Sequence, residues 1–134
     1  MPSGVAVLLA AGEVERLYTG LSVLVSTATE GRTAAGLASF RALALLLDPD
    51  LMRRAQEPEV TPSLAWAGRE PFAASLVELR DLAVELEGLS LHACSASVET
   101  MGLTPEQVAD GGLDGVMSTP RFLREFEGEA LLFV

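Results

Sequence analysis

The 134-residue sequence contains no lysine, one cysteine and one histidine, and aromatic residues make up only 5% of it. Its nine basic residues, all arginine, are outnumbered by 19 acidic residues, which gives a formal net charge of −10. Affinity for nucleic acid depends on Lys and Arg side chains that neutralise phosphates, so a chain this acidic is not expected to bind nucleic acid. One cysteine cannot form an intramolecular disulfide, which favours a reducing, cytoplasmic location and leaves Cys94 free, metal-bound or exchanging with another molecule.

The sequence also lacks a hydrophobic run that is both long and uncharged. Residues 5–11 are apolar, but the run is short and Glu13 and Glu15 follow it, so it is neither a signal peptide nor a membrane span. Residues 37–47 come closer, but Arg41 interrupts them. We interpret this stretch as sheet core followed by a buried or lid-like segment.

The motifs of common cofactor and metal sites are absent as well. Residues 10–13 follow the first apolar run with neither a Gly-x-Gly-x-x-Gly fingerprint nor a Walker lysine, so Gly12 predicts a tight turn and no nucleotide cofactor is expected. One Cys and one His supply too few ligands for a zinc site in a single chain, and no metal is expected. Without a Cys-x-x-Cys motif, a self-contained dithiol oxidoreductase is excluded.

Hydrophobic residues make up 49% of the chain, and its mean hydropathy is +0.35. This length fits one domain, residues 1–134, which can bury a sizeable core built from Ala, Leu and Val. A positive mean hydropathy indicates that part of the apolar surface is buried against other subunits, so we expect a homo-oligomer.

Apolar periodicity predicts strands that alternate with helices along the whole chain. The predicted strands cover residues 4–10, 33–40, 89–94, 115–118 and, as a buried terminal strand, 130–134. The predicted helices begin at Glu13, Pro71, Ser95 and Pro105 and, capped by Thr119–Pro120, at the segment that carries Phe122. This order predicts an α/β fold, a three-layer α/β/α sandwich with a mainly parallel sheet of about five strands.

The interval 48–70 carries three prolines and is predicted to hold no long regular element. Asp48-Pro49 could cap a short helix through Gln56. A loop of this length in a compact domain is usually a lid, a binding loop or an oligomer contact. Pro71 follows it directly and is well placed as the first residue of the next helix.

Cys94 ends the predicted strand 89–94, and short polar residues suited to helix capping follow it. The thiol is therefore predicted at the carboxyl end of a strand, facing the free N–H groups of a helix, where open α/β sheets collect ligands. Such a position favours the thiolate, the form that attacks sulfur and accepts it as a persulfide. The alternative is a buried cysteine that behaves as a small hydrophobe.

Five further residues are candidates for substrate binding near this thiol. Ser95, Ala96 and Ser97 form the turn that could hold a sulfur anion, although capping of the next helix is the favoured role of the two serines. Arg41 follows the second strand and could steady an anion over the sheet, or be a solvated arginine of the lid. Gly12 ends the first strand at the same edge of the sheet.

His92 precedes Cys94 by two residues and would point to the same face of the strand. Side chains two apart on a strand are usually too far separated for a direct hydrogen bond. We therefore interpret His92 as a structural residue and not as the base of a papain-like pair.

The segment from Ala93 to Gly102, Ala-Cys-Ser-Ala-Ser-Val-Glu-Thr-Met-Gly, resembles the motif Ala-Cys-x-x-Ser-x-x-x-Met-Gly of the DsrE/DsrF-like sulfur-relay family. The short helix and Asp-Gly turn that follow it, and both ends of the chain, also look similar. The resemblance implies a parallel five-stranded sheet, trimers or hexamers, and cytoplasmic sulfur transfer through a persulfide on Cys94. This sequence departs from the pattern at Ala96, where members often carry methionine, and after the second strand, where Phe40 is the sole aromatic residue.

Together these features predict a small oligomeric sulfur carrier that uses one cysteine and no cofactor, with sulfur donor and acceptor proteins as partners. One alternative is a non-catalytic binding or assembly module in which Cys94 is only packed. Another is a redox sensor whose thiol forms an intersubunit or mixed disulfide under oxidant. A hydrolase is the least favoured, because His92 is the only histidine available as a base.

Overall fold

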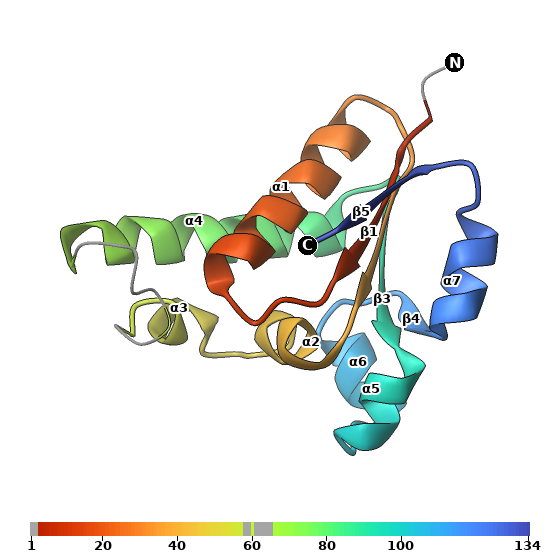
Figure 1. The fold of residues 1–134 in the computed structure, drawn as a ribbon. Coiled ribbons are helices and arrows are strands. Elements are labelled where there is room, and N and C mark those ends of the chain that lie inside the picture. Colours follow the sequence, from red (N-terminus) through yellow and green to blue (C-terminus); the bar gives the residue numbers. More distant parts are fainter. Residues whose placement is uncertain (1–2, 58–59, 61–65) are drawn as a thin grey trace.

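A computed structural model describes residues 3–57, 60 and 66–134 and contains one parallel sheet of five strands (Figure 1). The strands are β1 (Val5–Leu9), β2 (Ala34–Ala38), β3 (Leu89–Cys94), β4 (Gly115–Met117) and β5 (Ala130–Phe133). Their order across the sheet is β4-β3-β2-β1-β5, and all four neighbouring pairs are parallel. The predicted α/β class with a parallel, five-stranded sheet is therefore confirmed.

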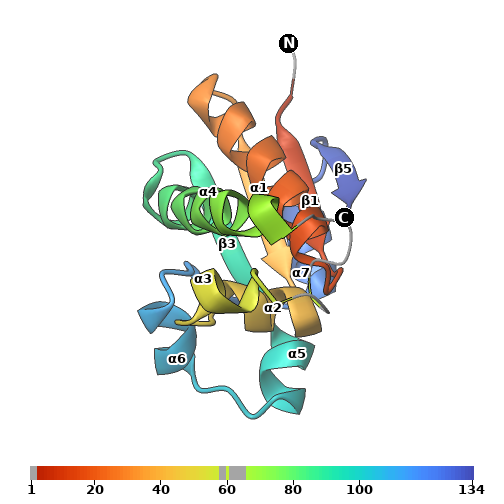
Figure 2. The same ribbon diagram turned by 90° about the vertical axis from the view of Figure 1, so that its left-hand side faces the viewer.

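Seven helices occur among the described residues. They are α1 (Val14–Thr29), α2 (Phe40–Leu46), α3 (Leu51–Arg54), α4 (Trp66–Glu85), α5 (Ser95–Thr100), α6 (Pro105–Asp110) and α7 (Thr119–Glu125). Helices α1 and α4 cover one face of the sheet, and α7 lies on the other (Figure 1). The short helices α2, α3, α5 and α6 gather beyond the carboxyl ends of the strands, as Figure 2 also shows. The result is the predicted three-layer sandwich, with most short helices at one edge of the sheet.

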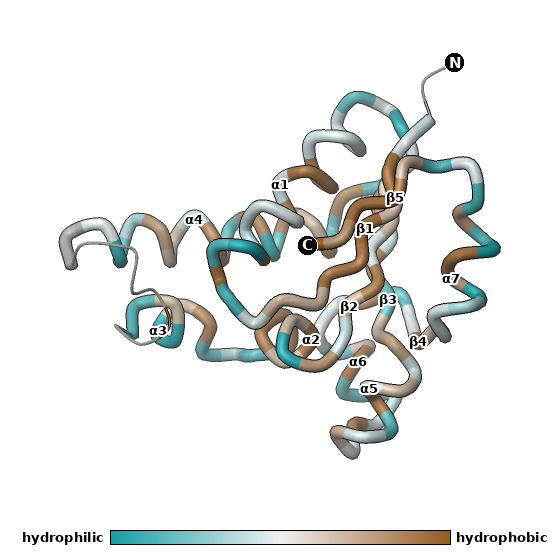
Figure 3. The backbone as a smooth tube through the Cα atoms, in the orientation of Figure 1, coloured by the Kyte–Doolittle hydropathy of each residue, from teal (hydrophilic) through white to brown (hydrophobic). Residues whose placement is uncertain are grey.

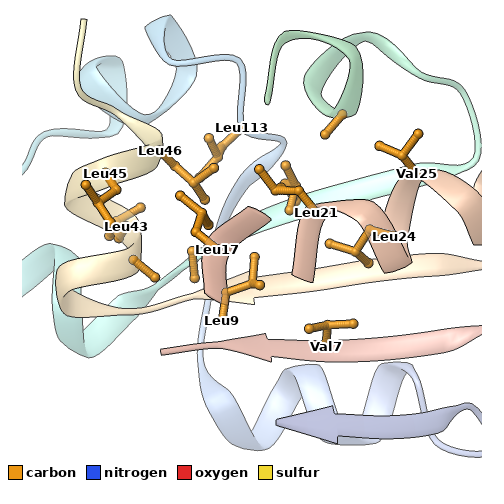
Figure 4. Packing of buried hydrophobic residues seen from close by; sticks show 14 of the residues in the cluster. Val7, Leu9, Leu17, Leu21, Leu24, Val25, Leu43, Leu45, Leu46 and Leu113 are labelled. Carbon is orange, nitrogen blue, oxygen red and sulfur yellow. The ribbon is translucent and has the colours of Figure 1, made fainter. Parts of the chain in front are cut away.

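The larger hydrophobic core lies between the sheet and helices α1 and α4 (Figure 4). Leu17, Leu21 and Leu24 recur at three- and four-residue spacing along α1 and are buried. Gly36 lets this helix approach closely, because a Cβ atom at that position would lie 3.1 Å from the Leu24 Cδ1 atom and 2.8 Å from the Leu91 Cδ2 atom. Close packing therefore explains why β2 contains glycine at position 36, a residue of low β-propensity.

A smaller core lies on the α7 face of the sheet. It unites buried residues of four strands with one aromatic ring from α7; these are Ala6, Ala35, Leu37, Cys94, Met117 and Phe122. Alternate residues of a strand face opposite sides of a sheet, which places Cys94 on this face and Ala93 on the other. Among the described helices only α7 covers this face, so Phe122 is the principal side chain that closes the core over Cys94.

The helix after the proline-rich interval begins earlier than predicted. Helix α4 starts at Trp66, so the prediction that Pro71 is the first helical residue is wrong. Pro71 lies inside the helix, where its missing N–H group removes one hydrogen bond. The buried residues Ala73 and Leu76 that follow supply the packing that holds the helix, because tertiary contacts outweigh local preference.

Between β2 and α4 the chain forms two short helices. The prediction of a buried or lid-like segment after β2 missed α2, because its continuous apolar run has no helical period. Helix α3 matches the short helix predicted after Asp48-Pro49, although it ends at Arg54 and not at Gln56. The remainder of the predicted loop, residues 58, 59 and 61–65, lies outside the described residues.

The last strand, β5, is exposed along its whole length, so the prediction of a buried terminal strand is wrong. It pairs with β1 and forms one edge of the described sheet, and the Phe133 side chain is 76% exposed. Its apolar residues are visible in Figure 3 as a brown strand beside β1. In the described part of the chain, no helix has both the length and the apolar character required to span a membrane.

Candidate functional site around Cys94

Cys94 is the last residue of β3 and the residue that precedes α5, as predicted. Strand β3 lies between β2 and β4, so Cys94 is at the carboxyl end of an interior strand and not of an edge strand. The residue is 6% exposed. Its extended backbone (φ −64°, ψ 126°) turns directly into the helix, which brings the first amides of α5 towards the sulfur.

Helix α7 places a polar side chain close to the sulfur. The Thr119 hydroxyl oxygen lies 3.9 Å from the Cys94 sulfur. The predicted capping role of Thr119 is wrong, because the Ser118 hydroxyl accepts the hydrogen bond from the Arg121 amide and caps the helix instead. Thr119 is thereby free to face Cys94, and the parallel pairing of Cys94 with Met117 brings the two segments together.

The surroundings of Cys94 lower the pKa of its thiol from the ordinary value. Burial is the largest single influence and raises the pKa. It is outweighed by the amide and hydroxyl of Ser97, the amide of Ala96 and the hydroxyl of Thr119, all of which favour the anion. The thiolate is the nucleophilic form of cysteine, so this turn makes Cys94 more reactive near neutral pH than its burial alone would allow.

Ser97 is fully buried and bridges two helices. Its hydroxyl oxygen accepts a hydrogen bond of 3.0 Å from the Phe40 amide, the first amide of α2. No side chain among the described residues caps α5, so the favoured interpretation of Ser95 and Ser97 as caps of that helix is wrong. Ser97 instead satisfies a donor of α2, which otherwise has no partner inside its own helix.

Phe40 has an unusual backbone conformation at this junction. Its φ angle is +43°, the only positive value among the described non-glycine residues. Such a conformation is unfavourable for a bulky L-residue and persists only where the surroundings enforce it. The Phe40 side chain is nevertheless 48% exposed, so the conformation is not imposed by burial of the ring.

His92 shares the α7 face of the sheet but packs against a ring. Its imidazole centroid lies 6.4 Å from that of Phe126. Burial lowers the pKa of His92, and the nearby carboxylates of Asp114 and Glu125 only partly oppose this. Within the described part of the chain, His92 makes no hydrogen bond to Cys94, so the geometry offers no base for a Cys-His pair.

Gly12 and Arg41 lie together in a separate cleft of about 400 Å³ between the end of β1 and helices α2 and α3. The Arg41 side chain packs over Gly12, because a Cβ atom at position 12 would lie 2.5 Å from the Arg41 Cδ atom. Arg54 and Asp48 line the same cleft and form an ion pair at 2.6 Å. Cys94 is not among the described residues that line this cleft, so the predicted site residues fall into two groups at the carboxyl edge.

Metal ligands do not cluster in the described part of the chain, where no group of three or more His, Cys, Asp or Glu side chains could hold an ion. No protein-family model matches the sequence, and neither does any curated protein. The residues around Cys94 are therefore the basis for inferring the function.

Two residues of this site were not predicted from the sequence. Thr119 was hidden because its position before a proline is typical of a helix cap, whereas strand pairing decides what it faces. Phe40 was noticed only as an aromatic residue, and its left-handed backbone has no signal in the sequence because glycine or asparagine usually marks that conformation.

Proposed function

We propose that this protein is a sulfur carrier in which Cys94 accepts sulfane sulfur from a donor persulfide and passes it to an acceptor thiol. The observation that carries the proposal is the position of Cys94 at the carboxyl end of β3 and the start of α5, with the Thr119 hydroxyl 3.9 Å from its sulfur. The turn amides and the Ser97 and Thr119 hydroxyls lower the pKa of the thiol. Because that stabilisation comes from donors fixed in the fold, it is available to any sulfur anion held at the same place. The similarity of this segment to the DsrE/DsrF-like motif supports the same function.

The transfer needs no cofactor and no net oxidation. The Cys94 thiolate attacks the outer sulfur of the donor R–S–SH, a new S–S bond forms, and the donor leaves as the thiolate R–S⁻. The acceptor thiolate then attacks the outer sulfur of the Cys94 persulfide, and Cys94 is released again as a thiolate. Each step exchanges one S–S bond for another, so the electrons balance within the pair of reactants.

The low exposure of Cys94 argues for this reaction over the redox-sensor alternative. An intersubunit disulfide would require two sulfur atoms about 2.05 Å apart, with their Cα atoms within roughly 7 Å. Helix α7 and the turn after β3 enclose the sulfur in its own subunit, and such an approach of two backbones would displace them. A sulfur donor presented on one flexible cysteine fits the site more easily, entering past the exposed Ala96 and Thr119 side chains.

We also propose that the carrier is a homo-oligomer that uses the edge strand β5. The amides of Ala130 and Val134 donate to carbonyl groups of residues 4 and 8, so alternation along the strand directs the polar groups of Leu131 and Phe133 away from β1. The four residues of β5 carry no charge and no proline, the features that usually protect an edge.

A second β5 fits this edge in antiparallel orientation about a two-fold axis at Leu132. Leu131 of one copy then opposes Phe133 of the other, and their backbone groups can exchange four hydrogen bonds. Two-fold pairing builds a dimer, which is compatible with a hexamer that contains two-fold axes but not with an isolated trimer.

The relay is tested by incubating the reduced protein with a low-molecular-weight persulfide and measuring its intact mass. We expect one added sulfur, about 32 Da, on the wild type and none on Cys94→Ser, and we expect a thiol acceptor to remove it. Absence of the adduct, or equal addition to Cys94→Ser, would contradict the proposal. Slow alkylation typical of an ordinary buried thiol would favour the assembly-module alternative, and an intersubunit disulfide after mild peroxide would favour the redox sensor.

A further inference from the structure

The cleft beside Gly12 has the properties of a second binding site. Its volume of about 400 Å³ is in the range of small-molecule sites, and it lies between the end of β1 and helix α2, where open α/β sheets bind their ligands. Its walls combine guanidinium groups, a carboxylate and apolar side chains; the described residues of these kinds are Arg41, Arg54, Asp48, Ala44 and Leu45. Charged and apolar surfaces therefore face the same space.

Among the described residues that line the cleft, Asp48 is the only one with a carboxylate, and both oxygen atoms of that group are already bound. The Oδ2 atom accepts a hydrogen bond of 2.6 Å from the Arg54 Nε atom, and the Oδ1 atom accepts one of 2.8 Å from the Asp50 amide. The Asp48 carbonyl also accepts a hydrogen bond of 2.7 Å from Arg80. Asp48 is thus held in place by other groups and is not a partner for Arg41.

Arg54 reaches Asp48 through its Nε atom and keeps further donors. A guanidinium group has five N–H donors in one rigid plane. In the described part of the chain, the two terminal nitrogen atoms of Arg54 donate no hydrogen bond. Because the bond to Asp48 restricts the guanidinium plane, these donors are partly preorganised for a second anion.

Arg41 is also available to an anion. It forms no ion pair with any described residue. The absence of a side chain at Gly12 makes room for the stem of Arg41, since a Cβ atom at position 12 would lie 2.5 Å from its Cδ atom and 3.0 Å from its Cβ atom. With two guanidinium groups and one carboxylate, the described lining carries one positive charge in excess, although the net charge of the chain is −10.

We propose that this cleft binds a small carboxylate with a short aliphatic chain. A planar carboxylate matches the planar donors of a guanidinium group and can accept two hydrogen bonds from it. One excess positive charge balances a monoanion, whereas the second charge of a phosphate dianion would stay uncompensated. Ala44 and Leu45 supply apolar surface for the aliphatic chain.

The first test titrates butyrate into the isotope-labelled protein and follows the backbone amide signals by NMR. We expect saturable shifts at Gly12, Ala44 and their neighbours, with a Kd in the millimolar range, and no such shifts with chloride at equal ionic strength. Acetate should bind roughly fourfold more weakly, because it lacks two methylene groups that would be partly buried against Leu45. Inorganic phosphate should also bind more weakly than butyrate.

Three results of this titration would count against the proposal. Butyrate that causes no saturable shift at the cleft would overturn it. Tighter binding of phosphate would overturn the assignment of a monocarboxylate. Equal affinity for acetate and butyrate would overturn the role of the aliphatic chain.

Substitutions then separate the cleft from a general effect of charge. Arg41→Gln should raise the Kd for butyrate roughly tenfold, as expected for the loss of a charged hydrogen-bond donor. Arg124→Gln removes the same charge from an exposed position of α7, outside the lining of the cleft, and should leave the Kd unchanged. An unchanged Kd in Arg41→Gln, or an equal rise in Arg124→Gln, would overturn the proposal.

Gly12→Ala tests the geometry without any change of charge. Its Cβ atom would displace the Arg41 side chain, so this variant should also bind butyrate more weakly, and circular dichroism should show an intact fold. Wild-type affinity in Gly12→Ala would mean that the position of Arg41 over Gly12 does not matter for binding, contrary to the proposal.

The carboxylate site is independent of the proposed sulfur transfer, because Cys94 is not among the described residues that line the cleft. Cys94→Ser should therefore bind butyrate with the Kd of the wild type, and loss of binding in this variant would contradict a separate site. Persulfide formation on a protein that does not bind butyrate would remove the carboxylate site and leave the carrier function. Butyrate binding without persulfide formation would do the reverse.

Discussion

The Thr119 hydroxyl and the Cys94 sulfur lie 3.9 Å apart, although 25 residues separate them in the chain. Parallel pairing of β3 with β4 brings them together, and Ser118 frees the threonine by capping α7 in its place. Helix α7 therefore has two roles at the site. It closes the smaller core over the thiol through Phe122, and it supplies a hydroxyl that favours the thiolate.

Replacing Thr119 by valine removes the hydroxyl and keeps the shape of the side chain. We expect alkylation of Cys94 near neutral pH to slow by roughly fivefold, because one hydrogen bond to an anion of about 1 kcal/mol is lost. The pH profile of the alkylation rate should move to higher pH, which stopped-flow or mass-spectrometric measurement detects. Thr100→Val, on the exposed end of α5, is the matched control and should leave the profile in place. A profile unaffected by Thr119→Val would mean that the 3.9 Å contact has no influence on the thiol.

Local sequence patterns sufficed to predict the turn at Cys94 and the helix α6. Alternating apolar residues end at Cys94, and Thr104 and Gln107 form the predicted capping box in both directions. Both features depend on residues that are close in sequence. What surrounds the sulfur depends on strand order instead, and no pattern within residues 89–102 indicates that Thr119 would face it.

The exposure of β5 escaped prediction for a related reason. Its apolar run Ala130–Phe133 is the same pattern that marks β1, a strand buried on both faces. Burial is decided by position in the sheet, and β5 lies outside β1 at the edge. The extra turn of α4 before Pro71 was likewise invisible, because a proline is favoured at the start of a helix and α4 tolerates it in the interior.

Phe122 should be the most sensitive position of α7. Its side chain is fully buried in the smaller core, so Phe122→Ala is expected to lower the free energy of unfolding by about 3–5 kcal/mol. Because the same ring covers the face that holds Cys94, alkylation of the thiol should become faster at high pH, where ionisation is complete. Leu123→Ala changes the exposed neighbour on the same helix and should cost less than about 1 kcal/mol. Urea unfolding monitored by circular dichroism measures both values, and equal losses would contradict the assigned packing.

His92 should make the protein less stable in mild acid. Burial lowers the pKa of His92 in the folded state, so below about pH 6.5 the unfolded state binds more protons at this residue. Its contribution is therefore fully present above that pH and is lost as the pH falls through the folded pKa. The free energy of unfolding should decrease between about pH 7 and pH 5, with a slope below the one-proton limit of roughly 1.4 kcal/mol per pH unit because the ring is partly exposed.

A His92→Gln variant isolates this contribution. It keeps a polar side chain of similar size but cannot titrate, so its stability should vary less with pH over the same window. Chemical denaturation at matched pH values gives the comparison. Parallel curves for the two proteins would show that His92 does not carry the effect.

Asp48 affects stability in a separate, more acidic pH range. Burial raises the pKa of its carboxyl group, but the hydrogen bond from Arg54 and the Asp50 amide outweigh burial and lower the pKa. The contribution of Asp48 to the free energy of unfolding is therefore lost only in stronger acid.

The oligomer proposal makes a prediction about the edge strand. Phe133→Glu places a charge on the most exposed large apolar residue of β5, where it would meet Leu131 of the second copy. The new carboxylate would also repel the other acidic residues of a chain with net charge −10. We expect this variant to sediment as a smaller species than the wild type at equal concentration and to keep the stability of the monomer within about 0.5 kcal/mol, because the residue is exposed. Leu82→Glu also replaces an exposed apolar residue by glutamate, but on α4 and not on β5. This control variant should leave the mass of the oligomer unchanged. Analytical ultracentrifugation distinguishes the outcomes: a wild-type monomer at micromolar concentration would remove the oligomer altogether, whereas an oligomer unaffected by Phe133→Glu would move the interface away from β5.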